Sequence, residues 1–221
     1  MSRYKIDGQK IQVLYPAANK TYQPADQEVK EKIKEQYTEG KEYFLFSGAV
    51  HPRNNLMNLL KAFSFFKKRQ KSNMQLVIVS PVILPDDVFM KSLRLYKYRR
   101  EVKVLTGLPE DELQKLFAAA YAYVRPAIVE NNFTAILNAM QCGVPAICGN
   151  SKVAMETCGD AALYSNPDNF EDIAEKMMLL FKDENKRNGL IQKGLLQSAK
   201  YNSGEMMAQL WKIIFATIQP L

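Results

Sequence analysis

This sequence contains few histidines and cysteines, the side chains that most often act as metal ligands, nucleophiles or general bases near neutral pH. The 221 residues include one histidine, His51, and three cysteines, Cys142, Cys148 and Cys158. One histidine excludes a multi-histidine metal centre, and no acidic cluster suggests a carboxylate one, so we expect no metal cofactor. No general base accompanies Cys148 or Cys158, and Cys142 is predicted to lie in the core. His51 could hydrogen-bond a phosphate or an acceptor, or face solvent.

Basic residues outnumber acidic ones by 30 to 23, which gives a formal net charge of +7. This excess is compatible with phosphorylated ligands, an anionic membrane surface or nucleic acid. The basic residues gather at positions 67–71 and 91–103. No basic-aromatic motif or zinc-finger spacing accompanies them, so we expect no nucleic-acid partner. A solvated helix face is the simplest interpretation, and peripheral membrane contact through a basic helix around residues 91–103 is the alternative.

The composition is typical of a globular protein in a reducing compartment. Hydrophobic residues make up 47% of the chain and charged residues 24%. No apolar run approaches the roughly 20 residues of a membrane-spanning helix, and residues 1–10 lack the apolar centre of a secretion signal. An odd number of cysteines without a CxxC pair argues against a disulfide framework. We therefore expect a cytoplasmic protein, with the inner face of the membrane as the alternative location.

Short apolar runs alternate with longer amphipathic stretches along the chain. Wholly apolar runs are typical of strands buried on both faces of a parallel sheet. Strands are predicted at residues 11–15, 43–46, 76–79, 102–105, 122–124, 145–148 and 162–164. Leu56, Leu59 and Phe63 mark one face of an intervening helix, and Pro109 with the acidic residues after it begins another. The predicted fold class is α/β, a doubly wound and mainly parallel sheet.

Residues 169–218 form a helical C-terminal end, with breaks predicted near Asp183 and at residues 201–204. Ser203 is placed to cap the last helix. Its apolar positions, Met206, Leu210, Trp211 and Ile214, predict that this helix packs against the rest of the protein. Since no repeat or low-complexity linker interrupts the chain, residues 1–221 are predicted to form one domain.

A ligand of such a fold is expected at the carboxyl ends of the strands. The corresponding loops span residues 47–55, 80–86, 106–110, 125–132 and 149–151. A nucleotide site is the default for this architecture. However, no GxGxxG follows the first strand and no GxxxxGK[ST] occurs, which argues against a dinucleotide dehydrogenase and a P-loop enzyme.

Four stretches share order and spacing with one family. They are YFLFSGAVHPRNNL at 43–56, VLTGLPEDELQKLFAAA at 104–120, Glu130 followed by NAMQCGVPAI at 138–147, and ETCGDAALY at 156–164 followed by Pro167-Asp168. Together they resemble the C-terminal, donor-binding domain of GT-B-fold retaining glycosyltransferases of family 4, the group 1 glycosyltransferases. The resemblance covers residues 10 to 218.

The resemblance implies a domain that binds a nucleotide-diphosphate sugar and transfers the sugar with retention, in polysaccharide or cell-envelope synthesis. Family members have two Rossmann-like domains, and residues 10–19 resemble the strand just after the interdomain linker. The chain would then be the second half of a longer protein, whose N-terminal domain holds the acceptor. A stand-alone α/β domain is the alternative.

The family's residue roles carry over unevenly. Breaking a sugar–phosphate bond places negative charge on the leaving diphosphate, which positive groups and helix N-termini should face. The family's Arg and Lys at that place are Ala49 and Asn54 here, and Arg53 could stand in. Glu130 matches the first Glu of the family's E-x7-E motif, which contacts the sugar, whereas Asn138 replaces the second, which holds the ribose.

The resemblance implies Glu130 and Arg53 as the catalytic residues. The implied donor-binding residues are Gly48, Asn54, Thr106, Gly107, Leu108, Asn131, Asn132, Phe133, Thr134 and Asn138. Residues 106–108 would border the nucleobase through their backbone, and Asn131 and Phe133 replace glycines of the family. Because the departures fall at catalytic positions, a degenerate domain that serves as a binding or regulatory module is the alternative function.

Overall fold

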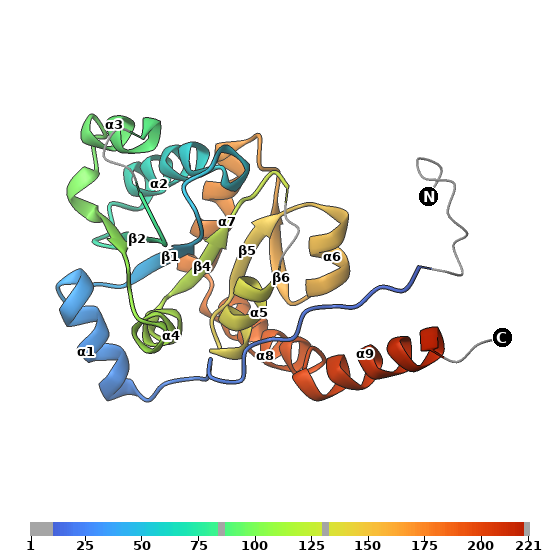
Figure 1. Ribbon diagram of the computed structural model, residues 1–221. Helices are drawn as coiled ribbons and strands as arrows, with labels where there is room; N and C mark the ends of the chain where they lie inside the picture. The colour runs from blue at the N-terminus through green and yellow to red at the C-terminus, as the bar shows by residue number, and fades with distance from the viewer. Residues whose placement is uncertain (1–10, 84–86, 130–132, 219–221) are drawn as a thin grey trace.

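The computed structural model describes residues 11–83, 87–129 and 133–218. Within them a parallel sheet of six strands has the order β3-β2-β1-β4-β5-β6 (Figure 1). The strands are β1 Tyr43–Ser47, β2 Gln75–Ser80, β3 Val102–Thr106, β4 Ala122–Arg125, β5 Ala146–Gly149 and β6 Ala162–Ser165. The α-helices are α1 Gln27–Thr38, α2 Leu56–Gln70, α3 Val88–Arg94, α4 Glu110–Ala119, α5 Thr134–Gln141, α6 Lys152–Cys158, α7 Phe170–Lys182, α8 Glu184–Ala199 and α9 Ser203–Ile218, and the 3₁₀ helices are η2 Pro52–Asn54 and η3 Arg99–Glu101. The predicted doubly wound α/β fold is confirmed.

Helices cover both faces of the sheet, so each central strand is buried on both sides. Along β1, Tyr43 and Leu45 join one core cluster with α1, α4 and α5, whereas Phe44 and Phe46 join the other with α2, α3 and α7. Leu45 lies opposite Val77 of β2 and Tyr123 of β4. Alternate side chains point to opposite faces, which is why an unbroken apolar run is compatible with a strand here.

Residues 11–15 do not form the predicted strand. Both edges of β1 are already paired, with β2 and β4, and the side chains of Ile11 and Val13 stay exposed. The segment instead lies beside the start of α9, where the Tyr15 and Tyr201 rings meet edge to face at 6.0 Å. An apolar run that neither face of a sheet buries gains nothing from strand geometry.

The predicted packing of the last helix is confirmed only in part: Met206, Leu210 and Ile214 are half-buried, whereas Trp211 is exposed. The breaks that bound α8 and α9 are confirmed, although Asn202 rather than Ser203 caps α9 by accepting a hydrogen bond from the Glu205 amide at 2.9 Å. No residue described in α9 is buried, and Trp211, Phe215 and Ile218 are more than half exposed. The helix extends past the sheet beyond α8 (Figure 1), and residues 15–17 lie beside its first turns.

Residues 91–103 do not form the basic helix that the membrane hypothesis used. Helix α3 ends at Arg94, and the chain continues through a turn and η3 into β3. Tyr96 ends the helix because its side chain turns toward α2, where its hydroxyl donates to the Leu60 carbonyl at 2.7 Å. Within the described residues, no helix combines the length and hydrophobicity that crossing a bilayer requires.

Candidate functional site

The strand order reverses between β1 and β4. The chain adds β2 and β3 on one side of β1 and then returns to place β4, β5 and β6 on the other. In open parallel sheets, ligands bind at the carboxyl ends of the two strands that flank such a reversal. The loop after β1, residues 48–55, and the loop after β4, which begins at Pro126, therefore bound the candidate site.

Arg125, the last residue of β4, brings a positive charge to this point. Its Nη1 donates to the Ser47 carbonyl oxygen at 2.6 Å, and its Nη2 lies 3.4 Å from Oδ1 of Asn54. The guanidinium also lies over the Phe46 ring, 5.9 Å from the centroid. Sequence reasoning missed Arg125. The available signal was a cation at the carboxyl end of an otherwise apolar strand, AYVR.

Gly48, one of the predicted donor-binding residues, is the first residue of the loop after β1, and the structure explains why glycine stands there. Its φ is +150°, and a Cβ built on it would lie 2.8 Å from Nη1 of Arg125. The missing side chain therefore lets the guanidinium approach the β1 loop. The Gly48 amide donates to the Val79 carbonyl at 2.9 Å, so this N–H is already engaged in the sheet.

Arg53 lies on η2 in the same loop, with an exposed side chain. His51 caps η2, and its Nδ1 accepts from the Arg53 amide at 3.1 Å and lies 3.4 Å from Arg53 Nε. The Ile128 amide donates to the Arg53 carbonyl at 2.9 Å, which ties the β1 loop to the β4 loop. Ile128 precedes Glu130 by two positions. Glu130, Asn131 and Asn132 themselves lie outside the described residues.

Two adjacent asparagines hold the β1 loop in place. Nδ2 of Asn54 donates to the Ala49 carbonyl at 2.7 Å. The buried Nδ2 of Asn55 donates to the Pro126 carbonyl at 3.0 Å and to the Pro167 carbonyl at 2.6 Å. Asn55 has φ +60°, a conformation that asparagine tolerates better than most residues. Sequence reasoning missed this positioning role, although the pair Asn54-Asn55 before an amphipathic helix is typical of a turn.

The start of α5 reaches the same edge of the sheet. Thr134 is its first residue. Phe133 precedes it with φ −91°, which any residue adopts, and its ring is buried in the core. The replacement of a family glycine by Phe133 therefore strains nothing. Asn138, on the second turn, is 6% exposed, and its Oδ1 accepts from the Asn19 amide at 3.0 Å.

Thr106, Gly107 and Leu108 follow the edge strand β3, and Thr106 and Gly107 are exposed. Since β2 separates β3 from β1, these residues lie about 10 Å along the sheet edge from the Gly48 loop, at about 4.8 Å per strand. The described part of the predicted site thus occupies one edge of the sheet, with cations at its centre and the 106–108 turn at one end.

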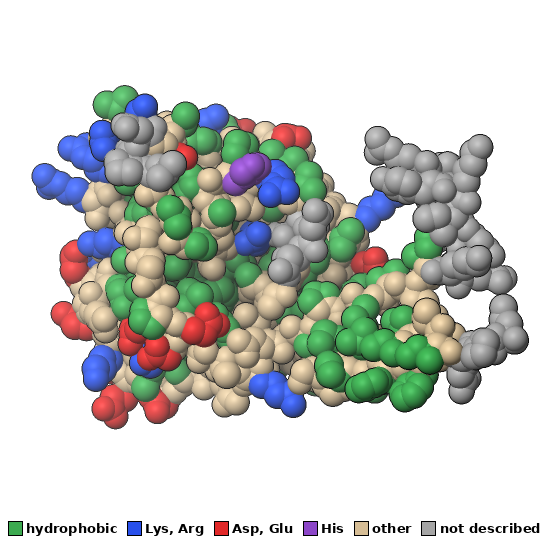
Figure 2. All heavy atoms as spheres, viewed as in Figure 1, with side chains coloured by type: hydrophobic (Ala, Val, Ile, Leu, Met, Phe, Trp, Pro, Cys, Tyr) green, Lys and Arg blue, Asp and Glu red, His purple; other side chains and the backbone are tan. Residues whose placement is uncertain are grey.

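The three cysteines and the histidine lie outside the cluster formed by Arg53, Arg125 and Gly48, or at its border. Cys142, Cys148 and Cys158 form no disulfide bond and are buried, which confirms the predicted core position of Cys142. Burial also raises the pKa of the Cys142 thiol to about 12. Within the described residues, no three His, Cys, Asp or Glu side chains gather around a point where a metal ion could bind. The histidine lies at the surface on the face that Figure 2 shows. It borders an apolar hollow of about 340 Å³ between η2 and the start of α3.

The chain is similar in sequence to glycosyl transferases. The family model described as "Glycosyl transferases group 1" matches residues 28–197. O-antigen chain mannosyltransferase B of Escherichia coli is 28% identical over 160 residues, which are 72% of this chain and 42% of that protein. O-antigen chain mannosyltransferase RfbU of Salmonella typhimurium is 30% identical over 168 residues, 75% of this chain and 42% of that protein. The chain thus spans about two fifths of the length of these relatives.

Solved structures share its fold. The crystal structure of HepE of Anabaena in complex with UDP-glucose has a TM-score of 0.81 at 16% identity, covering 93% of this chain and 57% of that one. The C-terminal domain of the group 1 family protein LpcC of Francisella tularensis has a TM-score of 0.72 at 16% identity, covering 85% of this chain and 99% of that domain. The second comparison matches this chain to an almost complete C-terminal domain.

Proposed function

The chain belongs to the group 1 glycosyl transferases, and from this premise we propose that it is a donor-binding domain of a retaining, family 4 enzyme. It holds a nucleotide-diphosphate sugar, whose sugar is transferred to an acceptor in polysaccharide synthesis. The two O-antigen mannosyltransferases among its relatives and the UDP-glucose complex among its structural neighbours favour a hexose as the transferred sugar.

The observation that carries this proposal is the meeting of Arg125 with the Gly48 loop where the strand order reverses. The leaving diphosphate gains negative charge as the sugar–phosphate bond breaks, and preorganised cations lower the energy of that step. Ala49 and Asn54 remove the two cations that the family supplies. We assign their role to Arg53 and Arg125, because a guanidinium binds phosphate in a bidentate manner. With two arginines at the diphosphate, the donor binds without a metal ion.

The other predicted residues contact the sugar, the ribose and the base of the donor. Glu130 contacts the sugar, and the turn at residues 106–108 borders the base. Oδ1 of Asn138 already accepts from Asn19, so its amide Nδ2 is the group left for a ribose hydroxyl. The N-terminus of α5, which begins at Thr134, directs backbone N–H groups toward the same edge of the sheet and favours an anion there.

The acceptor is held by a second, N-terminal domain. Two observations support this part of the proposal. The chain spans 42% of its mannosyltransferase relatives. Helix α9 also presents Trp211, Phe215 and Ile218 on an apolar side that no described residue covers, a surface suited to a second domain. Three free cysteines fit a cytoplasmic enzyme.

Isothermal titration of the folded chain with UDP, GDP and ADP tests donor binding. We expect heat with one of the three, unchanged by EDTA. The Arg125→Ala variant should bind at least tenfold more weakly, whereas Arg99→Ala, an exposed arginine of η3, serves as the matched control. No heat with any of the three nucleotides would rule out the donor-binding proposal.

One observation favours a second function, a degenerate domain kept for binding or regulation. Asn54 and Asn138 stand where the family has a Lys and a Glu. Each forms a hydrogen bond within the protein, Asn54 to the Ala49 carbonyl and Asn138 from the Asn19 amide. If this function holds, the parent chain binds no nucleotide and the double variant Asn54→Lys, Asn138→Glu acquires affinity. A parent that binds as tightly as this variant would contradict it.

A further inference from the structure

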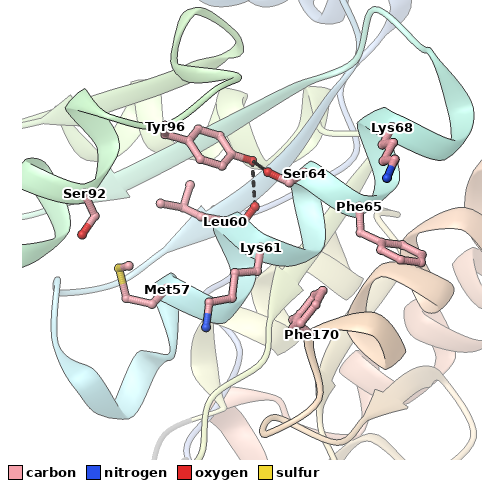
Figure 3. A pocket seen from close by; sticks show the side chains of 9 residues that line it. All are labelled: Met57, Leu60, Lys61, Ser64, Phe65, Lys68, Ser92, Tyr96 and Phe170. Atoms are coloured by element: carbon pink, nitrogen blue, oxygen red, sulfur yellow. Dashed lines mark hydrogen bonds between the residues drawn. The ribbon is translucent and has the colours of Figure 1, made fainter.

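A hollow of about 400 Å³ lies on the outer side of α2, between α3 and the start of α7. Leu60, Phe65, Tyr96 and Phe170 line it, and the ammonium groups of Lys61 and Lys68 extend from α2 beside it (Figure 3). The buried residues of α2, such as Leu59 and Phe63, face the sheet instead. The hollow therefore lies outside the donor site, on the exposed side of the helix layer.

Two hydroxyl groups of the hollow, those of Tyr96 and Ser64, are already hydrogen-bonded. The Tyr96 hydroxyl donates to the Leu60 carbonyl at 2.7 Å and accepts from the Ser64 hydroxyl at 2.9 Å (Figure 3). An apolar group that covers these two hydroxyls would leave neither of their hydrogen bonds unmade. The aromatic and aliphatic walls thus favour a hydrocarbon ligand.

Exposed apolar side chains continue this surface onto α3. Val88 is 73% exposed and Leu95 is 89% exposed, and together with Lys91 they have the i, i+3, i+7 spacing of one helix side. Met57 lines both the hollow and the adjoining one that Val88 borders, so α2 and α3 share a continuous surface. We call this surface the α2–α3 face; its residues are Met57, Lys61, Phe65, Lys68, Val88, Lys91, Leu95, Tyr96, Lys97 and Phe170.

Positive charge is interleaved with these apolar side chains. Lys61, Lys68 and Lys91 make no ion pair with any described residue. The Lys97 ammonium lies 5.4 Å from the centre of the Tyr98 ring. Figure 2 shows basic side chains gathered over the α3 end of the molecule. Lys61 and Lys68, seven residues apart, are about 10 Å apart along the axis of α2.

We propose that the α2–α3 face docks on the surface of an anionic lipid bilayer. The lysines contact lipid phosphates, while Val88, Leu95 and the hollow meet the boundary between headgroups and acyl chains. Basic residues interleaved with exposed aliphatic ones are the combination that interfacial binding uses. A nucleic acid is less suited, because a sugar–phosphate backbone gains nothing from exposed Val88 and Leu95. The face adjoins the loop after β1, since His51 and Pro52 line the same hollow as Val88, but the proposal does not rest on donor binding.

Co-sedimentation of the full chain with vesicles tests the proposal. We expect binding to phosphatidylglycerol–phosphatidylcholine vesicles that weakens as salt is added, and no binding to phosphatidylcholine alone. The double variant Lys61→Glu, Lys68→Glu and the single variant Leu95→Asp should each lower the affinity for these vesicles by about tenfold or more. Matched controls on α8, Lys186→Glu and Leu196→Asp, should bind like the parent; Leu196 is 72% exposed.

The single tryptophan separates this surface from the other exposed apolar one. Trp211 lies on α9, so docking through the α2–α3 face leaves its emission unchanged. A blue shift on adding vesicles would place the contact on α9 and overturn the proposal. Equal binding to neutral vesicles, or displacement by glycerol phosphate at constant ionic strength, would overturn it too. Retention of a duplex nucleic acid that Leu95→Asp leaves unaffected, without vesicle binding, would show a nucleic-acid surface instead.

Discussion

Nη1 of Arg125 lies 2.6 Å from the carbonyl oxygen of Ser47, so the last residue of β4 bonds to the last residue of β1. These are the two strands between which the order of the sheet reverses. The contact fixes a guanidinium beside the Gly48 loop and aligns the two loops of the candidate site. Substitutions here should therefore change donor binding more than they change stability.

Replacing Arg125 by alanine should weaken nucleotide binding by about 1.5–3 kcal/mol, the usual contribution of a hydrogen bond between charged groups. Arg125→Lys should recover only part of this, because an ammonium cannot bond phosphate and the Ser47 carbonyl in one plane. Titration calorimetry measures the affinity, and thermal unfolding serves as the control for the lost hydrogen bond. Equal affinities for Arg125→Ala and the parent would remove Arg125 from the site.

The fit between Gly48 and Arg125 predicts a non-additive pair of substitutions. Gly48→Ala should destabilise the fold by about 1–3 kcal/mol, because its φ is +150° and the new Cβ would lie 2.8 Å from Arg125 Nη1. In the double variant with Arg125→Ala the clash with the guanidinium disappears, although the new Cβ still lies 3.3 Å from Cζ of Phe46, so urea unfolding should show less than the sum of the two losses. Gly107→Ala is the control, since φ there is +65° but no atom lies within 4 Å of the new Cβ.

The sheet could be predicted because its central strands are buried on both faces. A run such as residues 76–79 has no other stable position in a protein of this size, and the alternation with helices then gives the parallel order. Amphipathic α9 was harder. Its pattern predicts an apolar contact, but which surface makes that contact does not follow from Trp211 or Ile214 themselves. The prediction of a strand at residues 11–15 failed for a similar reason, because an apolar run does not show which element it lies against.

The candidate site was predictable only in part. Gly48 and Arg53 follow from motif spacing. Arg125 was missed because a basic residue after an apolar strand has the pattern of a solvated strand end, and its role depends on β4 lying next to β1. Asn138 keeps the position of a family carboxylate, yet its oxygen bonds to Asn19, a contact 119 residues away in the chain. Such long-range pairings leave no trace in local sequence.

Asn55 should matter for both stability and binding. Asn55→Ala removes the donor that joins the Pro126 and Pro167 carbonyls and places a less tolerant residue at φ +60°. Unfolding in urea should show a loss of about 1–3 kcal/mol. Asn55→Gly relieves the backbone strain but not the lost bonds. If the glycine variant is as stable as the parent, the two hydrogen bonds contribute nothing.

Exposure of α9 predicts tolerance to polar substitution there. Phe215 is 59% exposed, so Phe215→Ser should change the free energy of unfolding of this chain by less than about 0.5 kcal/mol. Met177→Ala on α7, whose side chain is fully buried, should cost about 2–5 kcal/mol. Urea denaturation compares them. A large loss for Phe215→Ser would mean that the side of α9 that carries Phe215 also packs on this chain.

Alkaline pH should destabilise the fold because buried acids of high pKa ionise only after unfolding. Burial raises the pKa of the Cys142 thiol to about 12, and it raises the pKa of Tyr43 well above its ordinary value of 10.0. The unfolded chain releases these protons near pH 9 to 10, whereas the folded chain retains them. Stability is therefore complete below about pH 8 and falls as the pH rises toward the folded-state values.

Urea midpoints measured between pH 7 and pH 11 test this, and Tyr43→Phe isolates one of the groups. The variant loses the hydrogen bond from the Tyr43 hydroxyl to the Leu116 carbonyl, 2.7 Å long, which should cost about 1 kcal/mol at pH 7. It also has no phenol to ionise, so its stability should fall less steeply above pH 9 and approach that of the parent. Parallel curves for the two proteins would show that Tyr43 keeps an ordinary pKa in the folded state.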